Sequence, residues 1–334
     1  MSNTLHWWED VKALQSGKMV HPHFTTLQTS DICNQHCHGC AYGDLTGKYL
    51  PLEKHLTVID ILTRVGVKAF DLCGGGEPLV MPGAVEIINY CGQRGAAVGL
   101  VTNGTLLKSA AVGAMAGCGT YIRVSLEASN ADDYSQYKGV PSAVFHEVTR
   151  NVSDALKHLR SAGSKCDVGV KFAVGRMLRG QEHYERAIEL GQKLGVQRIT
   201  FKALRHEPEE LTLDEKKHEN LLLNRAIQAS GAQNVKVCIV PIDPERVPQC
   251  YLTPLHVALD WRGNIYLCCY YYYREKELRL FNIFEDDFEA KWFDPAHWEK
   301  IRAISRAECG RVDCKFFAHH EAVAAAENGA LYFL

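Results

Sequence analysis

The sequence lacks the features that would tie the protein to a membrane or to nucleic acid. None of its apolar runs reaches the roughly 18–20 residues needed to span a bilayer. The N-terminal segment MSNTLHWWEDVKALQSGK has no apolar stretch of the kind found in signal peptides. Neither sign of charge dominates, because 37 Lys and Arg oppose 39 Asp and Glu. We therefore expect a cytoplasmic protein with no nucleic-acid and no membrane partner.

Internal repeats are also missing, and the only low-complexity tract is four tyrosines at 270–273. Cysteine, in contrast, is plentiful, with 13 in 334 residues. An odd count in a cytoplasmic protein argues against a disulfide framework and favours reduced thiols, some of them metal ligands.

Short β-rich runs alternate with amphipathic segments between residues 20 and 205. The predicted strands lie at 23–30, 67–73, 97–103, 121–127, 167–174 and 197–204, and the predicted helices near 52–65, 81–94, 105–117, 142–162 and 180–194. This alternation predicts a parallel sheet with right-handed crossovers. Six units are too few for an eight-stranded barrel, so we predict an α/β fold, a partial (β/α)6 TIM-like barrel. Ligands of such sheets bind at the carboxyl ends of the strands.

Three cysteines follow the first predicted strand in DICNQHCHGC, with CxxxCxxC spacing: Cys33, Cys37 and Cys40. Thiolates are soft ligands that suit iron–sulfur clusters or zinc. A cubane cluster held by three thiolates keeps one iron open for a small chelating molecule. The alternatives are a zinc site completed by His36 or His38, and unligated core cysteines.

The second predicted strand ends in CGGGEP, residues 73–78. Gly74, Gly75 and Gly76 carry no side chain, so the backbone can approach a ligand closely, and Glu77 adds a carboxylate beside them. Alone this signal is weak, but here it follows the cysteine triad by one strand–helix unit.

The combination of CxxxCxxC, a GGE-type strand end, LVTNG (100–104) and RVSLEAS (123–129) resembles the radical S-adenosylmethionine (SAM) superfamily. The resemblance implies that SAM chelates the open iron of a [4Fe–4S] cluster. Gly74, Gly75, Gly76 and Glu77 would hold the methionine amino end, and Ser125 and Glu127 would lie near the ribose or the methionine. Further implied cofactor contacts are Asn103 and Lys138, the latter where relatives often place an arginine. Relatives usually have an aromatic residue before the last cysteine, where this chain has Gly39, and Tyr42 is the candidate substitute.

The resemblance also implies the chemistry. The reduced cluster passes one electron to the sulfonium, the C–S bond breaks, and the 5′-deoxyadenosyl radical abstracts a hydrogen atom from the substrate. We expect a flavodoxin- or ferredoxin-type reductant as a partner.

A second cysteine pattern, CX12GX4C, starts at Cys250 and ends at Cys268. It resembles the opening of the SPASM and twitch modules that bind auxiliary iron–sulfur clusters. LDWRGNIYLCC predicts a hairpin that turns at Arg262-Gly263. Cys309 and Cys314 would complete an auxiliary [4Fe–4S] cluster, although their CxxxxC spacing departs from the commoner CxxC. Cys269 is a rival for Cys268, and a four-cysteine zinc site is the alternative.

We predict five parts: an N-terminal extension (1–19), the partial barrel (20–205), a bridging segment with one helix (206–245), the twitch-like module (246–320) and a tail (321–334). The remaining cysteines are expected in the core: Cys73, Cys91, Cys118, Cys166 and Cys238. Tyr270 to Tyr273 are expected to extend the returning strand. Lys202, Arg205 and His206 end the sixth strand on the ligand side, where they fit a phosphate or carboxylate contact or a solvated basic edge.

A twitch-containing relative oxidises a secondary alcohol of an aminocyclitol, so our leading hypothesis is oxidation or epimerisation of a sugar, cyclitol or similar small molecule. Peptide modification is the alternative, although only about 20 residues precede the first strand, too few for a peptide-recognition domain. A non-enzymatic iron–sulfur or zinc protein would not need a SAM site. Cyclases of the molybdenum-cofactor type have a CxxC-started second site that this chain lacks.

Overall fold

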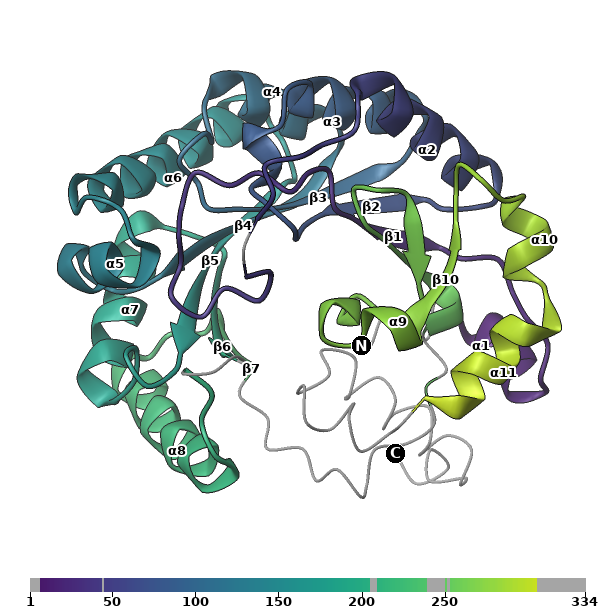
Figure 1. The fold of residues 1–334 in the computed structure, drawn as a ribbon. Coiled ribbons are helices and arrows are strands. Elements are labelled where there is room, and N and C mark those ends of the chain that lie inside the picture. Colours follow the sequence, from purple (N-terminus) through teal and green to yellow (C-terminus); the bar gives the residue numbers. More distant parts are fainter. Residues whose placement is uncertain (1–6, 44, 205–208, 239–249, 251–252, 305–334) are drawn as a thin grey trace.

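The structure is a computed structural model that describes residues 7–43, 45–204, 209–238, 250 and 253–304 (Figure 1). Its strands are β1 Phe24–Leu27, β2 Ala69–Leu72, β3 Ala97–Thr102, β4 Gly119–Glu127, β5 Asp167–Val174, β6 Arg198–Ala203, β7 Val235–Cys238, β8 His256–Leu259, β9 Asn264–Tyr266 and β10 Arg279–Asn282. Its helices are α1 Trp8–Gln15, α2 Leu52–Arg64, α3 Ala84–Gln93, α4 Ser109–Cys118, α5 Ala131–Lys138, α6 Ala143–Ser161, α7 Gln181–Leu194, α8 Leu213–Ser230, α9 Glu275–Leu278, α10 Phe288–Trp292 and α11 Pro295–Ala303.

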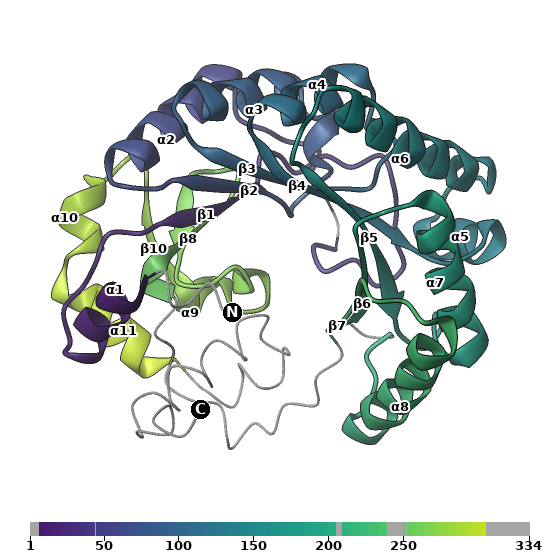
Figure 2. The ribbon, with the colours of Figure 1, turned by 180° about the vertical axis from the view of Figure 1, so that it is seen from behind.

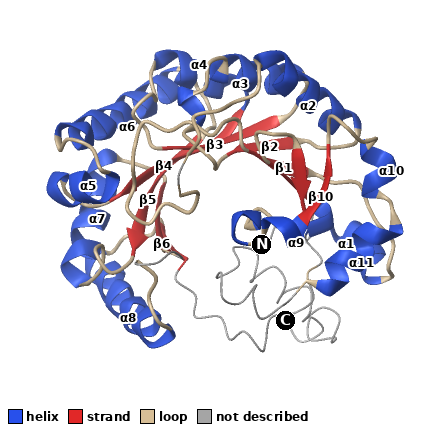
Figure 3. Ribbon diagram, in the orientation of Figure 1, coloured by secondary structure: helices blue, strands red, loops and turns tan. Residues whose placement is uncertain are grey.

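All ten strands form one sheet in the order β10-β9-β8-β1-β2-β3-β4-β5-β6-β7. The sheet curves into an open arc whose outer side carries helices α2, α3, α4, α6 and α7 (Figures 1 and 3). Strands β1 to β7 are mutually parallel. This is the partial barrel that the alternating sequence pattern predicts, and each of the six predicted strands and five predicted helices is present.

The predicted helix at 142–162 shows why these segments fold as they do. Its buried residues on α6 include Val148, Val152 and Leu159, which recur at helical spacing and face the sheet. They join one continuous core with strand residues such as Val124 and Val170. Among the described helices, none combines the length and the apolar character that crossing a bilayer requires.

Four strands extend the sheet beyond the predicted six, β7 at one edge and β8, β9 and β10 at the other. β7, in the segment predicted to bridge the modules, pairs in parallel with β6. β8 pairs in parallel with β1, where Thr25 Oγ1 also donates to the Val257 carbonyl at 2.9 Å. The C-terminal segment therefore continues the barrel sheet at its β1 edge, and α1, α10 and α11 gather beside it (Figure 2).

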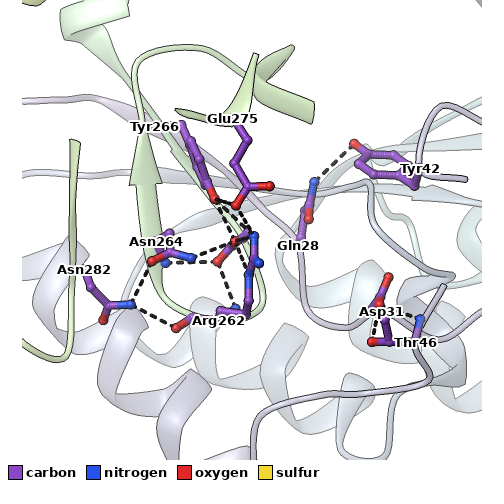
Figure 4. Close-up of polar contacts among 10 residues, drawn as sticks. Gln28, Asp31, Tyr42, Thr46, Arg262, Asn264, Tyr266, Glu275 and Asn282 are labelled. Atoms are coloured by element: carbon purple, nitrogen blue, oxygen red, sulfur yellow. Dashed lines mark hydrogen bonds and ion pairs between the residues drawn. The ribbon is translucent and has the colours of Figure 1, made fainter. Parts of the chain in front are cut away.

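The predicted hairpin is confirmed as β8 and β9, which pair in antiparallel fashion. Its turn is organised by Asp260, a buried carboxylate that accepts hydrogen bonds from Arg262, Asn264 and Tyr266, the three donors labelled in Figure 4. Gly263 adopts φ +88°, and a Cβ there would lie 2.5 Å from the Phe284 ring. The glycine of CX12GX4C is thus required both by the left-handed backbone and by packing.

Three buried histidines make the fold sensitive to mild acid. Burial lowers the pKa of His55, His183 and His297 from 6.5 to about 4. Between these values the unfolded chain binds protons that the folded chain does not, so the free energy of unfolding falls as the pH falls from 6.5 toward 4. Each histidine can contribute up to about 2 kcal/mol of this loss at pH 5.

We expect His297→Asn to reduce the loss of stability between pH 7 and pH 5 by about 1–2 kcal/mol. His297 donates from Nδ1 to the Trp292 carbonyl at 2.8 Å, a bond that the asparagine amide can replace. Urea denaturation at both pH values measures the effect. If the free energy of unfolding changes between pH 7 and pH 5 by the same amount in the variant and the wild type, His297 does not titrate as its burial implies.

Candidate active site

A cavity of about 310 Å³ opens at the carboxyl ends of the parallel strands. Its lining includes the residues predicted to bind the first cluster or SAM: Cys33, Cys37, Cys40, Tyr42, Gly74, Gly75, Gly76, Glu77, Asn103, Ser125, Glu127 and Lys138. These residues come from the ends of β1 to β4 and from α5, so the sheet topology gathers them from more than 100 positions of sequence. The C-terminal segment completes the lining with Cys269, Tyr270 and Tyr272. Arg205 and His206 lie outside the described residues.

The cysteine loop is held by backbone hydrogen bonds to the end of α5. The N–H of His36 donates to the Lys138 carbonyl at 3.0 Å, and that of His38 to the Tyr137 carbonyl at 2.7 Å. His38 also contacts the buried carboxylate of Glu209 at 3.3 Å. Three partly exposed thiols therefore face one cavity, a donor set that fits an iron–sulfur cluster. Within the described ranges, no three Cys, His, Asp or Glu side chains converge on a single metal ion.

The glycine segment lies directly against this loop. The N–H of Gly76 donates to the Ser30 carbonyl at 2.9 Å, and that of Glu77 to the Ile32 carbonyl at 2.6 Å. A Cβ on Gly76 would lie 1.8 Å from the Ile32 oxygen, and one on Gly75 would lie 2.5 Å from the Ser30 oxygen. The glycines are therefore needed for the contact between the two loops. This requirement is separate from the freedom that glycine gives the backbone to approach a ligand closely.

Both carboxylate oxygens of Glu77 accept hydrogen bonds from other residues of the protein. Oε2 accepts from the N–H of Asn103 at 2.6 Å, and Oε1 accepts from Thr102 Oγ1 at 2.5 Å and from the N–H of Leu79 at 3.1 Å. Burial raises the pKa of Glu77, and these three donors oppose the rise. The side chain therefore ties the end of β2 to the end of β3.

Asn103 continues this connection to the cysteine loop. Its Nδ2 donates to Asn34 Oδ1 at 2.7 Å, and its Oδ1 accepts from the N–H and hydroxyl of Thr105. The side-chain amide of Asn103 thus already joins β3 to the segment between Cys33 and Cys37. A cofactor contact of Asn103, as predicted, would use the same amide.

Glu127 has the most unusual backbone of the site. Its φ is +68°, and it is the single non-glycine residue of the described ranges with a positive φ. Such strain concentrates at functional sites. Its Oε1 pairs with Lys171 at 3.0 Å, while its buried Oε2 has no hydrogen-bond partner among the described residues. Burial by itself raises the pKa of Glu127, but nearby ammonium groups outweigh burial, so its pKa is lowered.

Lys138 is a buried cation at the end of α5, with 2% of its surface exposed. Its ammonium lies 5.9 Å from the centre of the Tyr134 ring and forms no hydrogen bond or ion pair with a described residue. A buried ammonium that forms no hydrogen bond to an anion is costly, even with the carboxylate of Glu127 nearby. It is therefore suited to receive a carboxylate in the cavity.

Tyr42, the predicted substitute for the aromatic residue that this chain lacks before Cys40, lines the cavity. Gly39 adopts φ +72°, a backbone that disfavours an aromatic side chain at that position. Tyr42 instead lines the cavity, accepts a hydrogen bond from Gln28 Nε2 at 3.2 Å (Figure 4), and packs on Tyr272 with ring centres 4.8 Å apart.

The C-terminal cysteines are only partly described. Cys250 contacts Thr253 Oγ1 at 3.7 Å, and Cys268 Sγ accepts from the N–H of Tyr270 at 3.5 Å. Cys309 and Cys314 lie outside the described residues. The prediction that Tyr270 to Tyr273 extend the strand is wrong, because β9 ends at Tyr266 and a 3-10 turn occupies 271–273. Strand alternation consequently does not decide between Cys268 and Cys269.

Sequence reasoning missed several residues of the cavity. Cys91 and Cys166 are buried as predicted, but Cys73 lines the cavity, so its expected place in the core is wrong. Lys202, which the sequence predicted at the ligand end of the sixth strand, lines the cavity, and so does Lys171 of β5. The available signal was the position of Lys202 next to the last residue of β6, whereas Lys171 lies in the middle of β5.

Residues 27–190 match the family model described as the radical SAM superfamily, and residues 250–315 match SPASM, described as an iron–sulfur cluster-binding domain. The chain belongs to the radical SAM superfamily. Radical SAM membership with a SPASM domain brings a SAM-binding [4Fe–4S] cluster, SAM and auxiliary iron–sulfur chemistry.

Curated relatives match about half of the chain. A probable GTP 3′,8-cyclase of Pyrobaculum aerophilum is 29% identical over 174 residues, which cover 50% of this chain and 53% of the relative. An AdoMet-dependent heme synthase of Methanosarcina barkeri is 27% identical over 161 residues, or 48% of this chain and 43% of the relative. The chain thus spans about half the length of the curated relatives it matches.

Solved structures share the fold over more of the chain. Streptococcus suis SuiB bound to its precursor peptide SuiA superposes with a TM-score of 0.69 at 14% identity, covering 90% of this chain and 71% of SuiB. Native anSMEcpe with bound AdoMet gives a TM-score of 0.64 at 15% identity, covering 89% and 88%. At these identities the likeness shows the fold alone.

Proposed function

We propose that this enzyme reductively cleaves SAM and abstracts a hydrogen atom from a small molecule, a sugar, a cyclitol or a similar compound. The outcome would be oxidation or epimerisation, with the auxiliary cluster as an electron relay. The observation that carries the proposal is that one cavity is lined both by the three thiols of the cysteine loop and by Cys269, Tyr270 and Tyr272 of the C-terminal segment. A substrate between these walls would lie next to both halves of the chain.

The residues of the cavity fit the roles that SAM chemistry needs. Cys33, Cys37 and Cys40 would hold the cluster, and Lys138 would pair with the carboxylate of SAM. When bound, the cluster and SAM supply the electron and the 5′-deoxyadenosyl radical that removes the hydrogen atom. The protein's part is placement of the substrate and exclusion of water, for which Tyr42 and Tyr272 close one side of the cavity.

Two features favour a small substrate. The cavity volume of about 310 Å³ falls at the lower end of the range for small-molecule sites. The curated relatives are named for reactions on GTP and in heme synthesis, both small molecules. Peptide modification is the second candidate, favoured by the structure of SuiB with a precursor peptide. We place the reaction in the cytoplasm, with a flavodoxin- or ferredoxin-type protein as reductant.

The test is anaerobic reconstitution of the full chain with iron and sulfide. We expect about eight irons per chain, as two cubane clusters require, and formation of 5′-deoxyadenosine on reduction in the presence of SAM. Deuterium transferred into 5′-deoxyadenosine from labelled cyclitols or sugars would identify the substrate. A content of about four irons per chain would contradict the electron relay. Deuterium transfer from peptides alone would favour peptide modification over reaction of a small molecule.

A further inference from the structure

Glu209 is a buried carboxylate that lies against the cysteine loop. Its side chain is 2% exposed, and it follows β6 in the sequence. A buried carboxylate is costly unless hydrogen-bond donors or charges compensate it. The proposed contacts with the cluster and with SAM make no use of Glu209. Its two oxygens instead connect two separate segments of the protein.

One oxygen of Glu209 faces the turn that carries two of the three predicted cluster ligands. The N–H of Cys40 donates to the Cys37 carbonyl at 3.2 Å, which closes this turn. Within the turn, His38 Nε2 lies 3.3 Å from Glu209 Oε1. A Cβ on Gly39 would lie 3.3 Å from Cγ and 3.5 Å from Cβ of Glu209. The Glu209 side chain therefore occupies the space beside Gly39, where the sequence departs from its relatives.

The other oxygen of Glu209 is fixed by the loop that follows β5. The N–H of Met177 donates to Glu209 Oε2 at 2.9 Å. A Cβ on Gly175 would lie 2.7 Å from the same oxygen, so a glycine is what permits this close approach. The loop itself is closed by hydrogen bonds in both directions between Gly175 and Leu178, at 3.1 and 3.2 Å. Glu209 therefore connects the cysteine turn to a closed loop at the end of β5.

The end of α5 contributes a second contact to the same turn. The N–H of His38 donates to the Tyr137 carbonyl at 2.7 Å. Neither this contact nor that of Glu209 involves a thiol, so both can hold the turn whether or not a cluster is bound. A cluster needs its thiolates at fixed separations, and Cys37 and Cys40 supply two of the three. Groups behind metal ligands keep the ligands in place and raise the affinity of the site.

We propose that Glu209 is a positioning residue, which holds the turn from Cys37 to Cys40 in the conformation that binds the SAM-binding cluster. This inference rests on the proposed function, because it takes Cys33, Cys37 and Cys40 as the ligands of that cluster. Without Glu209 the turn would keep its contact with α5 and lose its connection to the loop after β5. The iron of this cluster should then be released faster.

Iron release from the anaerobically reconstituted full chain to the ferrous chelator bathophenanthroline tests this proposal. The Cys33/Cys37/Cys40→Ala triple variant gives the rate for the auxiliary cluster alone. The iron that the wild type binds in addition belongs to the SAM-binding cluster, and its release rate is the quantity to compare among the variants. This measurement needs neither SAM nor a substrate, so it does not depend on turnover.

Glu209→Ala should release the iron of the SAM-binding cluster about tenfold faster than the wild type. Glu209→Gln should release it at close to the wild-type rate, because its amide oxygen can still accept from the N–H of Met177 and its amide nitrogen can still contact His38. His38→Ala should give an increase of about threefold, since it removes one contact of a partly exposed side chain.

Glu219→Ala is the matched control. Glu219 is also buried, and it accepts from the N–H of Gly180 at 3.1 Å and from the Tyr184 hydroxyl at 2.7 Å. Its removal should lower the stability in urea and leave iron release at the wild-type rate.

Three outcomes would overturn the inference: wild-type release in both Glu209→Ala and His38→Ala, release from Glu209→Gln as fast as from Glu209→Ala, or an equal acceleration in Glu219→Ala. If Glu209→Ala does not fold, His38→Ala decides. A triple variant that binds as much iron as the wild type would instead contradict the proposed function, so the two failures are distinguishable.

Discussion

The Cys33/Cys37/Cys40→Ala triple variant should form no 5′-deoxyadenosine and should bind about four irons instead of about eight. The expected loss is complete because no electron can reach SAM without the cluster that these thiolates hold. The fold should survive, since the loop is held by the backbone bonds of His36 and His38 rather than by thiols. Iron content, visible absorbance and 5′-deoxyadenosine formation are the measurements.

Cys166→Ala is the matched control for this prediction. Cys166 is buried just before β5, at the opposite end of the strand from the cavity. Its removal should cost about 1 kcal/mol of folding stability and should leave iron content and SAM cleavage intact. If the triple variant still forms 5′-deoxyadenosine under reduction, the three cysteines do not hold the SAM-binding cluster.

Gly76→Ala should abolish SAM cleavage and lower the free energy of unfolding by about 3 kcal/mol. The added Cβ would lie 1.8 Å from the Ile32 oxygen, a backbone atom that no rotamer change can move. The two loops must then separate, which breaks the hydrogen bonds from Gly76 to Ser30 and from Glu77 to Ile32. Urea denaturation and cluster content measure the two effects.

Gly117→Ala in α4 controls for the substitution itself. A Cβ at Gly117 meets no atom within 4 Å, so this change should raise stability by up to about 1 kcal/mol through helix propensity. Wild-type stability and wild-type SAM cleavage in Gly76→Ala would show that the contact between the glycine segment and the cysteine loop is dispensable.

The sequence predicted the six strands of the barrel and the gathering of its ligand residues because both depend on local patterns. Strand–helix alternation fixes which strand ends share an edge. Cys33 and Gly76 follow β1 and β2, and Glu127 is the last residue of β4. Their contacts could not be predicted in the same way. That Glu77 binds the backbone of Asn103, or that Glu127 has φ +68°, depends on how separate loops meet.

The pairing of β8 with β1 likewise could not be predicted from local sequence patterns. The segment HVAL at 256–259 is short, and its partner lies more than two hundred residues earlier. Strand propensity also misled at the tyrosines, where Tyr271 leaves the sheet and stacks on Tyr266 with ring centres 3.8 Å apart. In both cases tertiary packing decides the structure, and propensity does not.

The pairing of β1 with β8 also delays completion of the sheet during synthesis. Thr25 and Val257 are 232 positions apart, and ribosomes add roughly 5–20 residues per second, so the nascent barrel waits roughly 10–50 s for this partner. During that interval the open edge of β1 is a template for pairing with other chains. Production at lower temperature or with added chaperone should therefore raise the yield of properly assembled enzyme.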